Sequence, residues 1–211
     1  MMSRRAYPLM LLLLLLVVVL LVACGGGEAA TNIPLGTSVE TTTPADPLEG
    51  WIEYTGPDGD FTIRMPEQPQ VQQETIDTAE GEVTISFYLV EADKAVWLVS
   101  SNTMPPLTAE AIASGDEQAI AEILQGGRDG ALNNINGTLE QERTIEVSGN
   151  PGVELQFSAP GEPGTEISEL KGIARMILAG PMLYQVMFLT VPEDMDETAT
   201  AYLDSFRVTG E

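Results

Sequence analysis

The sequence predicts an α+β domain in which helices pack on the faces of a mostly antiparallel β-sheet. Three observations predict this class. Most segments after residue 50 alternate apolar and polar residues with a period of two, as half-buried strands do. Short turns rich in Gly, Pro, Asn and Asp join these segments as hairpins, and two stretches with helical spacing interrupt them. The sequence has no internal repeat, which excludes a solenoid or a propeller.

The first half of the domain is expected to consist of strands. Phe61, Ile63 and Met65 alternate with polar residues, and the turn before them, 56–60, contains Gly and Asp. A second alternation has its apolar residues at Val83, Ile85, Phe87 and Leu89. The expected strands are, in order, 51–54, 61–65, 71–75, 83–89 and 95–99.

A helix is expected after Pro105 and Pro106, because apolar residues then recur every three or four positions. These residues are Ile120, Ile123, Leu124, Ala131, Leu132 and Ile135. Asp116 is the expected N-cap, since a short carboxylate accepts hydrogen bonds from the first free backbone N–H groups. Gly126 and Gly127 weaken this helix, and we expect either a kink or a close approach of another backbone there.

The second half returns to strands and ends in a helix. The expected strands are 139–147, 153–157, 169–179 and 182–190. The segment 183–189 is apolar at most positions on both faces, which predicts a central strand covered front and back. The last element is expected to start at Pro192 and to place four residues on one helical face, Ala199, Tyr202, Leu203 and Phe206.

The order of these landmarks resembles the PsbP-like group, whose α/β/α sandwich also occurs in the MOG-type Ran-binding proteins. The residues that carry the resemblance are 59–66, Pro69, 81–83, 136–139, 149–154, 183–186 and 203–208. It covers 51–208 and is closest to small exported bacterial proteins of that group with no assigned activity. Members of the wider group bind photosystem II or a small GTPase as non-enzymatic accessories, and the resemblance implies an adaptor-like role here.

The beginning of the chain has the pattern of a secretory leader. Arg4 and Arg5 precede an uncharged run of 14 residues, 9–22, made only of Leu, Val and Met. A membrane-spanning helix needs roughly 20 residues, whereas the apolar core of a signal peptide has roughly 7–15. The sequence therefore predicts a signal peptide over 1–23 and export to the extracytoplasmic side.

Leu21-Val22-Ala23-Cys24 at the end of this run resembles the lipobox of bacterial lipoproteins. In that family the cysteine sulfur receives a diacylglycerol and the bond before it is cut. The resemblance implies a mature chain attached to the cell membrane through Cys24. The alternatives are cleavage by the ordinary signal peptidase and an uncleaved anchor helix.

Residues 24–50 are expected to be the lipidated cysteine and a disordered acidic tether, followed by one globular domain over 51–211. The tether contains Gly, Ala, Thr, Pro and acids with little large apolar content, so it cannot bury enough surface to fold. The formal net charge of −23 becomes −25 once Arg4 and Arg5 leave with the leader. A surface with this charge repels phosphates, which argues against nucleic acid as a partner.

Several catalytic chemistries are excluded by composition. The chain has no histidine, and its one cysteine is Cys24, so histidine-based triads, histidine metal sites and zinc–thiolate sites are absent. No glycine-rich phosphate loop lies between a strand and a helix. We therefore expect no catalytic residue, no cofactor and no metal site of these kinds.

Three weaker possibilities remain open. Calcium would find carboxylates at Asp58 and Asp60, or in a second group at Glu193, Asp194 and Asp196. A pair of carboxylates would suit a hydrolase, and a Ser–Lys dyad would need Lys94 or Lys171.

The leading expectation from the sequence is a non-catalytic, membrane-anchored accessory module that binds a protein partner. Trp51 and Trp97 are the large aromatic residues that an exposed binding patch would contain. The alternative is a calcium- or small-solute-binding lipoprotein.

Overall fold

The computed structural model describes residues 46–78, 81–92, 94–161 and 167–210. The expected leader, Cys24 and the tether as far as residue 45 lie outside these residues. Residues from Asp46 to Glu211 form one compact unit. None of the helices in the described residues is long and apolar enough to cross a membrane.

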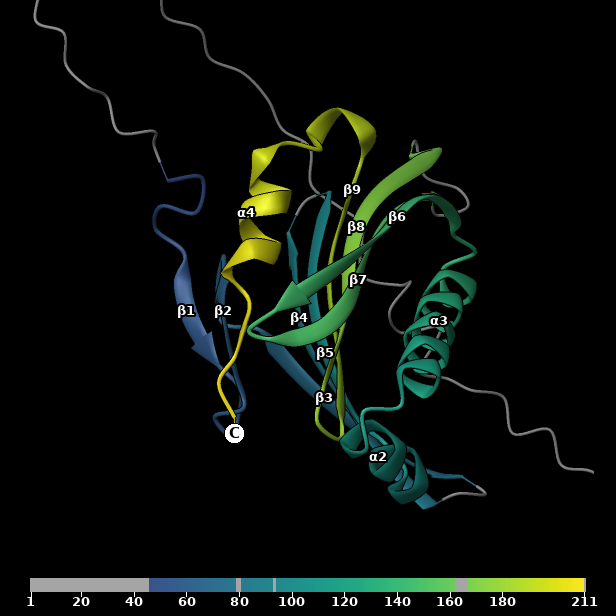
Figure 1. Ribbon diagram of the computed structural model, residues 1–211. Helices are drawn as coiled ribbons and strands as arrows, with labels where there is room; N and C mark the ends of the chain where they lie inside the picture. The colour runs from purple at the N-terminus through teal and green to yellow at the C-terminus, as the bar shows by residue number, and fades with distance from the viewer. Residues whose placement is uncertain (1–45, 79–80, 93, 162–166, 211) are drawn as a thin grey trace, which may run out of the picture. The chain divides into compact units, whose positions relative to one another are not determined.

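Seven of the described strands form one antiparallel sheet (Figure 1). In spatial order they are β3 (Gln70–Thr78), β4 (Gly81–Ala92), β5 (Ala95–Thr103), β9 (Met182–Thr190), β8 (Glu169–Ala179), β7 (Asn150–Pro160) and β6 (Thr138–Val147). Every neighbouring pair in this order is antiparallel. The predicted α+β class with a mostly antiparallel sheet is confirmed.

Helices and a smaller sheet cover the two faces of the large sheet. The small sheet has the order β1 (Ile52–Thr55), β2 (Phe61–Met65) and β10 (Arg207–Val208). It lies on the same side as helix α4 (Glu197–Ser205), and helix α3 (Glu117–Asn134) lies on the opposite side (Figure 1). Each face has its own hydrophobic cluster, here called the α4-side core and the α3-side core.

The central strand of the large sheet is β9, which has three strands on either side of it among the described residues. Tyr184, Val186 and Phe188 belong to the α4-side core. Leu183 and Met187 belong to the α3-side core. The prediction of a central strand covered on both faces is confirmed.

Helix α3 begins at the predicted N-cap and is not interrupted by its glycines. Asp116 Oδ1 accepts hydrogen bonds from the backbone N–H groups of Gln118 and Ala119, at 3.0 and 3.1 Å. A Cβ atom at Gly127 would lie 3.1 Å from Leu183 Cδ2, whereas one at Gly126 would meet nothing within 4 Å. Gly127 therefore allows the helix to lie close to the Leu183 side chain of β9, so the close contact is with a side chain and not with the backbone that we expected.

Two helical elements differ from the prediction. Helix α2 (Pro106–Ala113) is a separate element before α3, and the chain turns between them at Gly115, whose φ is +74°. The last helix starts at Glu197 rather than at Pro192, where only a short 3-10 helix, η1 (Pro192–Asp194), forms. The Asp196 side chain accepts from the backbone N–H of Thr198 at 2.8 Å and caps α4 at that point.

The orientation of β4 also differs from the simple alternation. Tyr88 is 4 % exposed and faces the α4-side core, with its ring 5.2 Å from that of Phe61. Phe87, on the face expected to be the buried one, is only half-buried. Period-two alternation assumes that one face of the strand is wet, and it fails here because Tyr88 contacts an additional layer built from β1 and β2.

Residues 46–50, which we expected in the tether, take part in the domain. Leu48 is 2 % exposed and belongs to the α4-side core. Asp46 Oδ1 accepts from the backbone N–H of Leu48 at 2.9 Å, and Asp46 Oδ2 pairs with Arg64 Nη1 at 2.7 Å. The backbone N–H of Leu48 and the Arg64 guanidinium lower the pKa of Asp46.

We predict that the three glycines of α3 respond differently to substitution by alanine. Gly126→Ala and Gly130→Ala should each raise the free energy of unfolding by about 1 kcal/mol, because both positions face open space and alanine favours the helix. Gly127→Ala should raise it less, because its Cβ would press on Leu183. Urea denaturation of the full chain measures all three, and an equal gain at Gly127 would contradict the close approach.

Candidate functional site

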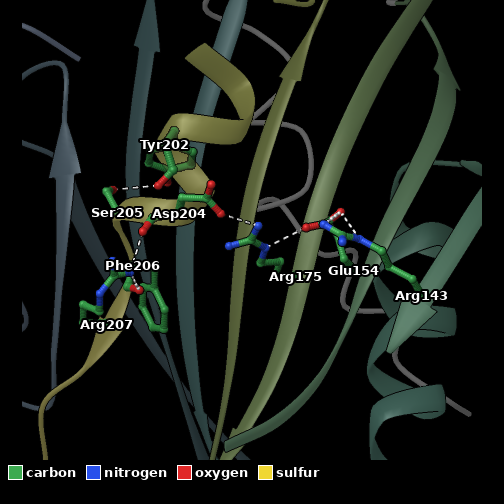
Figure 2. A network of polar contacts seen from close by, with 8 residues as sticks. All are labelled: Arg143, Glu154, Arg175, Tyr202, Asp204, Ser205, Phe206 and Arg207. Atoms are coloured by element: carbon green, nitrogen blue, oxygen red, sulfur yellow. Dashed lines mark hydrogen bonds and ion pairs between the residues drawn. The ribbon is translucent and has the colours of Figure 1, made fainter. Parts of the chain in front are cut away.

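A row of charged side chains crosses the α4 side of the sheet (Figure 2). Arg143 on β6 lies opposite Glu154 on β7, and Glu154 lies opposite Arg175 on β8. Asp204 of α4 lies over the end of this row and pairs with Arg175. We call these four residues the charged row.

The inner members of the charged row are buried and the outer members are exposed. Arg175 Nε donates to Glu154 Oε2 at 2.8 Å, and Arg143 Nε donates to Glu154 Oε1 at 2.7 Å. Arg175 Nη2 donates to Asp204 Oδ1 at 2.6 Å. The side chains of Glu154 and Arg175 are 5 % and 9 % exposed, against 65 % for Arg143 and 60 % for Asp204.

The charged row joins α4 to the sheet. Both oxygens of Glu154 accept from guanidinium groups, so the buried carboxylate is fully paired. An arginine stays protonated near neutral pH, so both ion pairs of Arg175 persist there. The arrangement therefore connects α4 to the sheet.

Neither Glu154 nor Arg175 was identified from the sequence. Arg175 is the single charged residue in the otherwise apolar run 172–179, and this was the available signal. A buried charge within an apolar strand requires a partner. The partner could not be named, because it depends on the register between β7 and β8.

A second polar cluster surrounds Asp60, one of the candidate calcium ligands. Tyr184 donates its hydroxyl to Asp60 Oδ2 at 2.7 Å, and Asp60 Oδ1 has no hydrogen-bond partner among the described residues. Burial, together with this hydrogen bond, raises the pKa of Tyr184 well above its ordinary value. Burial also raises the pKa of Tyr54 and of Tyr88.

The C-terminal segment closes over the same turn. Thr209 and Gly210 donate their backbone N–H groups to the Asp60 carbonyl at 2.9 and 3.3 Å. Thr209 Oγ1 donates to the Gly59 carbonyl at 2.6 Å. The turn between β1 and β2 is thus held by the chain end, and Asp60 has a structural task within it.

The other carboxylates considered as calcium ligands do not form a metal site within the described residues. Asp58 is exposed, as are Glu193 and Asp194 of η1, and Asp196 serves as the N-cap of α4. In the described residues no three or more His, Cys, Asp or Glu side chains come together in a way that could hold a metal ion.

The structure also shows the surroundings of Lys171 and Lys94, the two lysines considered for a Ser–Lys dyad. Lys171 pairs with Glu140 and, at 3.6 Å, with Glu169. The hydrogen bond with Glu140 raises the pKa of Lys171, which keeps it protonated and unsuited to act as a base. Lys94 is exposed, and its backbone carbonyl accepts from Thr190 Oγ1 at 3.1 Å.

A shallow polar pocket lies beside Lys171. Its volume is about 210 Å³, and its lining includes Thr138, Ser158 and Glu169. Ser158 is directly opposite Lys171 across β7 and β8. A hydrogen bond from Lys171, with a second one from Ser158, lowers the pKa of Glu140.

The two tryptophans belong to the α4-side core and do not form an exposed patch. Both side chains are half-buried, and their rings meet edge to face with centroids 5.6 Å apart. Trp51 also contacts Tyr202, whereas Trp97 contacts Phe188. We expected that Trp51 and Trp97 could form part of an exposed binding patch, and the structure places both in the α4-side core instead.

No protein-family model matches the chain. No curated protein matches it either.

Comparison with solved structures finds distant likenesses. A protein of unknown function from Pseudomonas aeruginosa, described as a putative regulator, is 12 % identical over 73 % of this chain and 92 % of its own, with a TM-score of 0.37. Cyanobacterial PsbP from Synechocystis is 13 % identical over 82 % of this chain and 98 % of its own, with a TM-score of 0.44. A protein from Bacteroides thetaiotaomicron is 10 % identical over 75 % of this chain and 48 % of its own, with a TM-score of 0.40. At these TM-scores we base no conclusion on the likenesses, although one of them is a member of the PsbP-like group.

We predict that Arg175→Met lowers the free energy of unfolding by about 3 kcal/mol, because it leaves the buried Glu154 with only its outer partner. Arg143→Met is the matched control at the exposed end of the row and should cost less than about 1 kcal/mol. The double variant Glu154→Leu with Arg175→Met should recover part of the loss. Urea denaturation of the full chain measures these values, and equal losses at Arg143 and Arg175 would contradict the role of burial.

We also predict that two buried tyrosines respond oppositely to replacement by phenylalanine. The Tyr202 hydroxyl has no partner among the described residues, so Tyr202→Phe should keep or raise stability at pH 7. Tyr184→Phe should lower it, because Asp60 loses its donor.

The pH dependence of the same variants follows from the raised pKa values. Burial raises the pKa of Tyr202, so its contribution to stability is complete below the unfolded value of about 10 and is lost as the pH rises above it. Tyr202→Phe should therefore lose less stability between about pH 9 and pH 11 than the unsubstituted chain. Unfolding measured at both pH values tests this, and parallel losses would count against the burial of Tyr202.

Proposed function

We propose that the protein is a membrane-anchored extracytoplasmic lipoprotein whose domain is a non-catalytic accessory module that binds a protein partner. The observation that carries the proposal is the leader that ends in Leu21-Val22-Ala23-Cys24. A diacylglycerol on the Cys24 sulfur would anchor the chain firmly, because each buried methylene contributes roughly 0.8 kcal/mol and two acyl chains act together. The 21 residues from 25 to 45 would then hold the domain roughly 25 Å from the membrane surface.

The charge of the domain supports a binding role. Five of the seven Lys and Arg residues after residue 45 pair with carboxylates, namely Arg64, Arg128, Arg143, Lys171 and Arg175. Arg207 donates to the backbone carbonyls of Asp204 and Phe206. Since the acids outnumber these cations, the field around the domain is negative, and it would steer a partner with a basic surface.

The polar clusters of the domain support the non-catalytic part of the proposal. The charged row has its buried groups paired, and Lys171 is held protonated by Glu140. Asp60 is held within a turn that the chain end closes. The charged row and the turn at Asp60 thus each connect elements of the domain.

We predict that Cys24→Ser abolishes lipid attachment and leaves the leader uncleaved. Without the thiol no diacylglycerol can be transferred, and the lipobox cleavage that follows transfer stops. Labelling intact cells with a radioactive or alkyne-bearing fatty acid, followed by mass measurement of the purified chain, measures both effects. The control Ala29→Ser changes the tether and leaves the lipobox intact, so it should be labelled and cleaved like the natural chain.

Two results would contradict the anchoring. Fatty-acid label in the Cys24→Ser chain would place the lipid elsewhere. A mature natural chain of unmodified mass, cut at a different bond, would indicate the ordinary signal peptidase.

A further inference from the structure

The two edges of the large sheet differ in their protection. The edge strand β6 has a register irregularity between Leu139 and Gln141, and its charged Glu140 and Glu142 pair with Lys171 and Arg128 from neighbouring elements. Bulges and charges of this kind prevent a further strand from pairing with an edge. The edge at β6 is therefore closed, in the sense that a further strand cannot pair with it.

The opposite edge strand, β3, is long, regular and exposed. Its nine residues pair one to one with β4 without a register shift. Residues 70–77 are all exposed, including Val71 at 52 % and Ile76 at 41 %. The strand contains neither proline nor lysine, which are the residues that usually protect an edge.

The hydrogen bonds of Thr84 show which backbone groups of β3 point outward. Thr84 donates its N–H to Thr103 Oγ1 at 2.8 Å, and its carbonyl accepts from the same hydroxyl, so both groups point to β5. Successive residues of a strand direct these groups to opposite sides, so Ile85 and Val83 bond to β3. Ile85 pairs with Glu74 of β3, and Val83 pairs with Ile76. The alternate residues of β3 therefore direct their N–H and C=O groups away from β4, to the free edge. These edge residues are Val71, Gln73, Thr75 and Asp77.

The charge along this edge has one sign. From residue 65 to residue 93 the sequence has seven acidic residues and no Lys or Arg. Glu74 and Asp77 lie on β3 itself, and Glu82 lies opposite Asp77 on β4. An incoming strand with positive side chains would complement them, whereas a second copy of this acidic chain would be repelled.

We propose that the free edge of β3 binds an extended, basic segment of a protein partner as an additional strand of the sheet. The partner would pair its backbone with Val71, Gln73, Thr75 and Asp77. Its cationic side chains would lie near Glu74, Asp77 and Glu82. This proposal rests on the proposed function, because it gives the binding module its docking surface and the chemistry of its partner.

The first test uses two peptides of equal charge with the full chain in detergent. One is a peptide of alternating valine and lysine with both termini blocked, about nine residues long to match β3. The other has the same sequence with alternate backbone nitrogens methylated, so that it cannot pair with an edge. Fluorescence anisotropy should show binding at least about ten-fold weaker for the methylated peptide, because it loses backbone hydrogen bonds and keeps its charge. Equal binding would overturn the proposal, since charge alone would then explain the association.

The second test changes the edge rather than the peptide. Thr75→Pro removes an outward N–H and leaves the backbone hydrogen bonds between β3 and β4 in place. It loses the hydrogen bond between Thr75 Oγ1 and Thr84 Oγ1 at 3.4 Å, and the control Thr75→Val loses the same bond. Thr75→Pro should weaken binding of the unmethylated peptide about ten-fold, whereas the matched control Thr75→Val, which keeps the N–H, should bind like the natural chain. Undiminished binding by a folded Thr75→Pro chain would overturn the proposal. The methylated peptide with the natural chain decides the question if that variant does not fold.

Two further outcomes separate this proposal from the proposed function. Concentration-dependent dimers that Thr75→Pro abolishes would make a second copy the occupant and overturn the basic partner. A photocrosslinking residue in place of Gln73, compared with one in place of Gln141 on β6, distinguishes the edges in intact cells. Capture of a partner only through position 141 would overturn the docking edge and leave the binding module standing.

Discussion

The burial of Arg175 between the large sheet and α4 is the constraint on which much of the domain depends. A guanidinium in that position must be paired, and Glu154 from the neighbouring strand and Asp204 from the helix supply its partners. The contact fixes α4, which in turn buries Tyr202, Leu203 and the following Phe206. Since Phe206 stacks on Phe61 of β2, with ring centroids 5.7 Å apart, the small sheet is positioned through the same contact.

The distribution of charged side chains over the domain links its structure to the proposed role. Most of the few cations of the domain hold one element to another, as Arg64 holds residues 46–48 to β2. Within the part of the chain that the structure describes, the carboxylates of β3 and β4 form no ion pair. The closed edge at β6 and the acidic, regular edge at β3 then give the sheet one side suited to pairing with another chain.

Local sequence patterns predicted most elements but not their relations in space. The bounds expected for 169–179 and 182–190 match β8 and β9, because the chain turns sharply at Gly180, whose φ is +53°. The inward orientation of Tyr88 could not be predicted, since it depends on a layer supplied by distant segments.

The same limit applied to the polar groups. The pairing of Arg175 with Glu154 is set by the register of β7 and β8. The identity of the edge strands is set by the order of the strands, in which β9 inserts between β5 and β8. Hydrophobic alternation contains neither piece of information. The resemblance of Leu21-Val22-Ala23-Cys24 to a lipobox, by contrast, depends on contiguous residues and needs no knowledge of the fold.

The most direct measurement of the central claim is chemical crosslinking of the full chain, with Cys24 present, in intact cells, followed by mass spectrometry of the purified adducts. The account predicts one extracytoplasmic or membrane protein in fixed stoichiometry, joined through an accessible basic segment. Recovery of the chain crosslinked only to itself, or to no protein at all, would contradict a binding module.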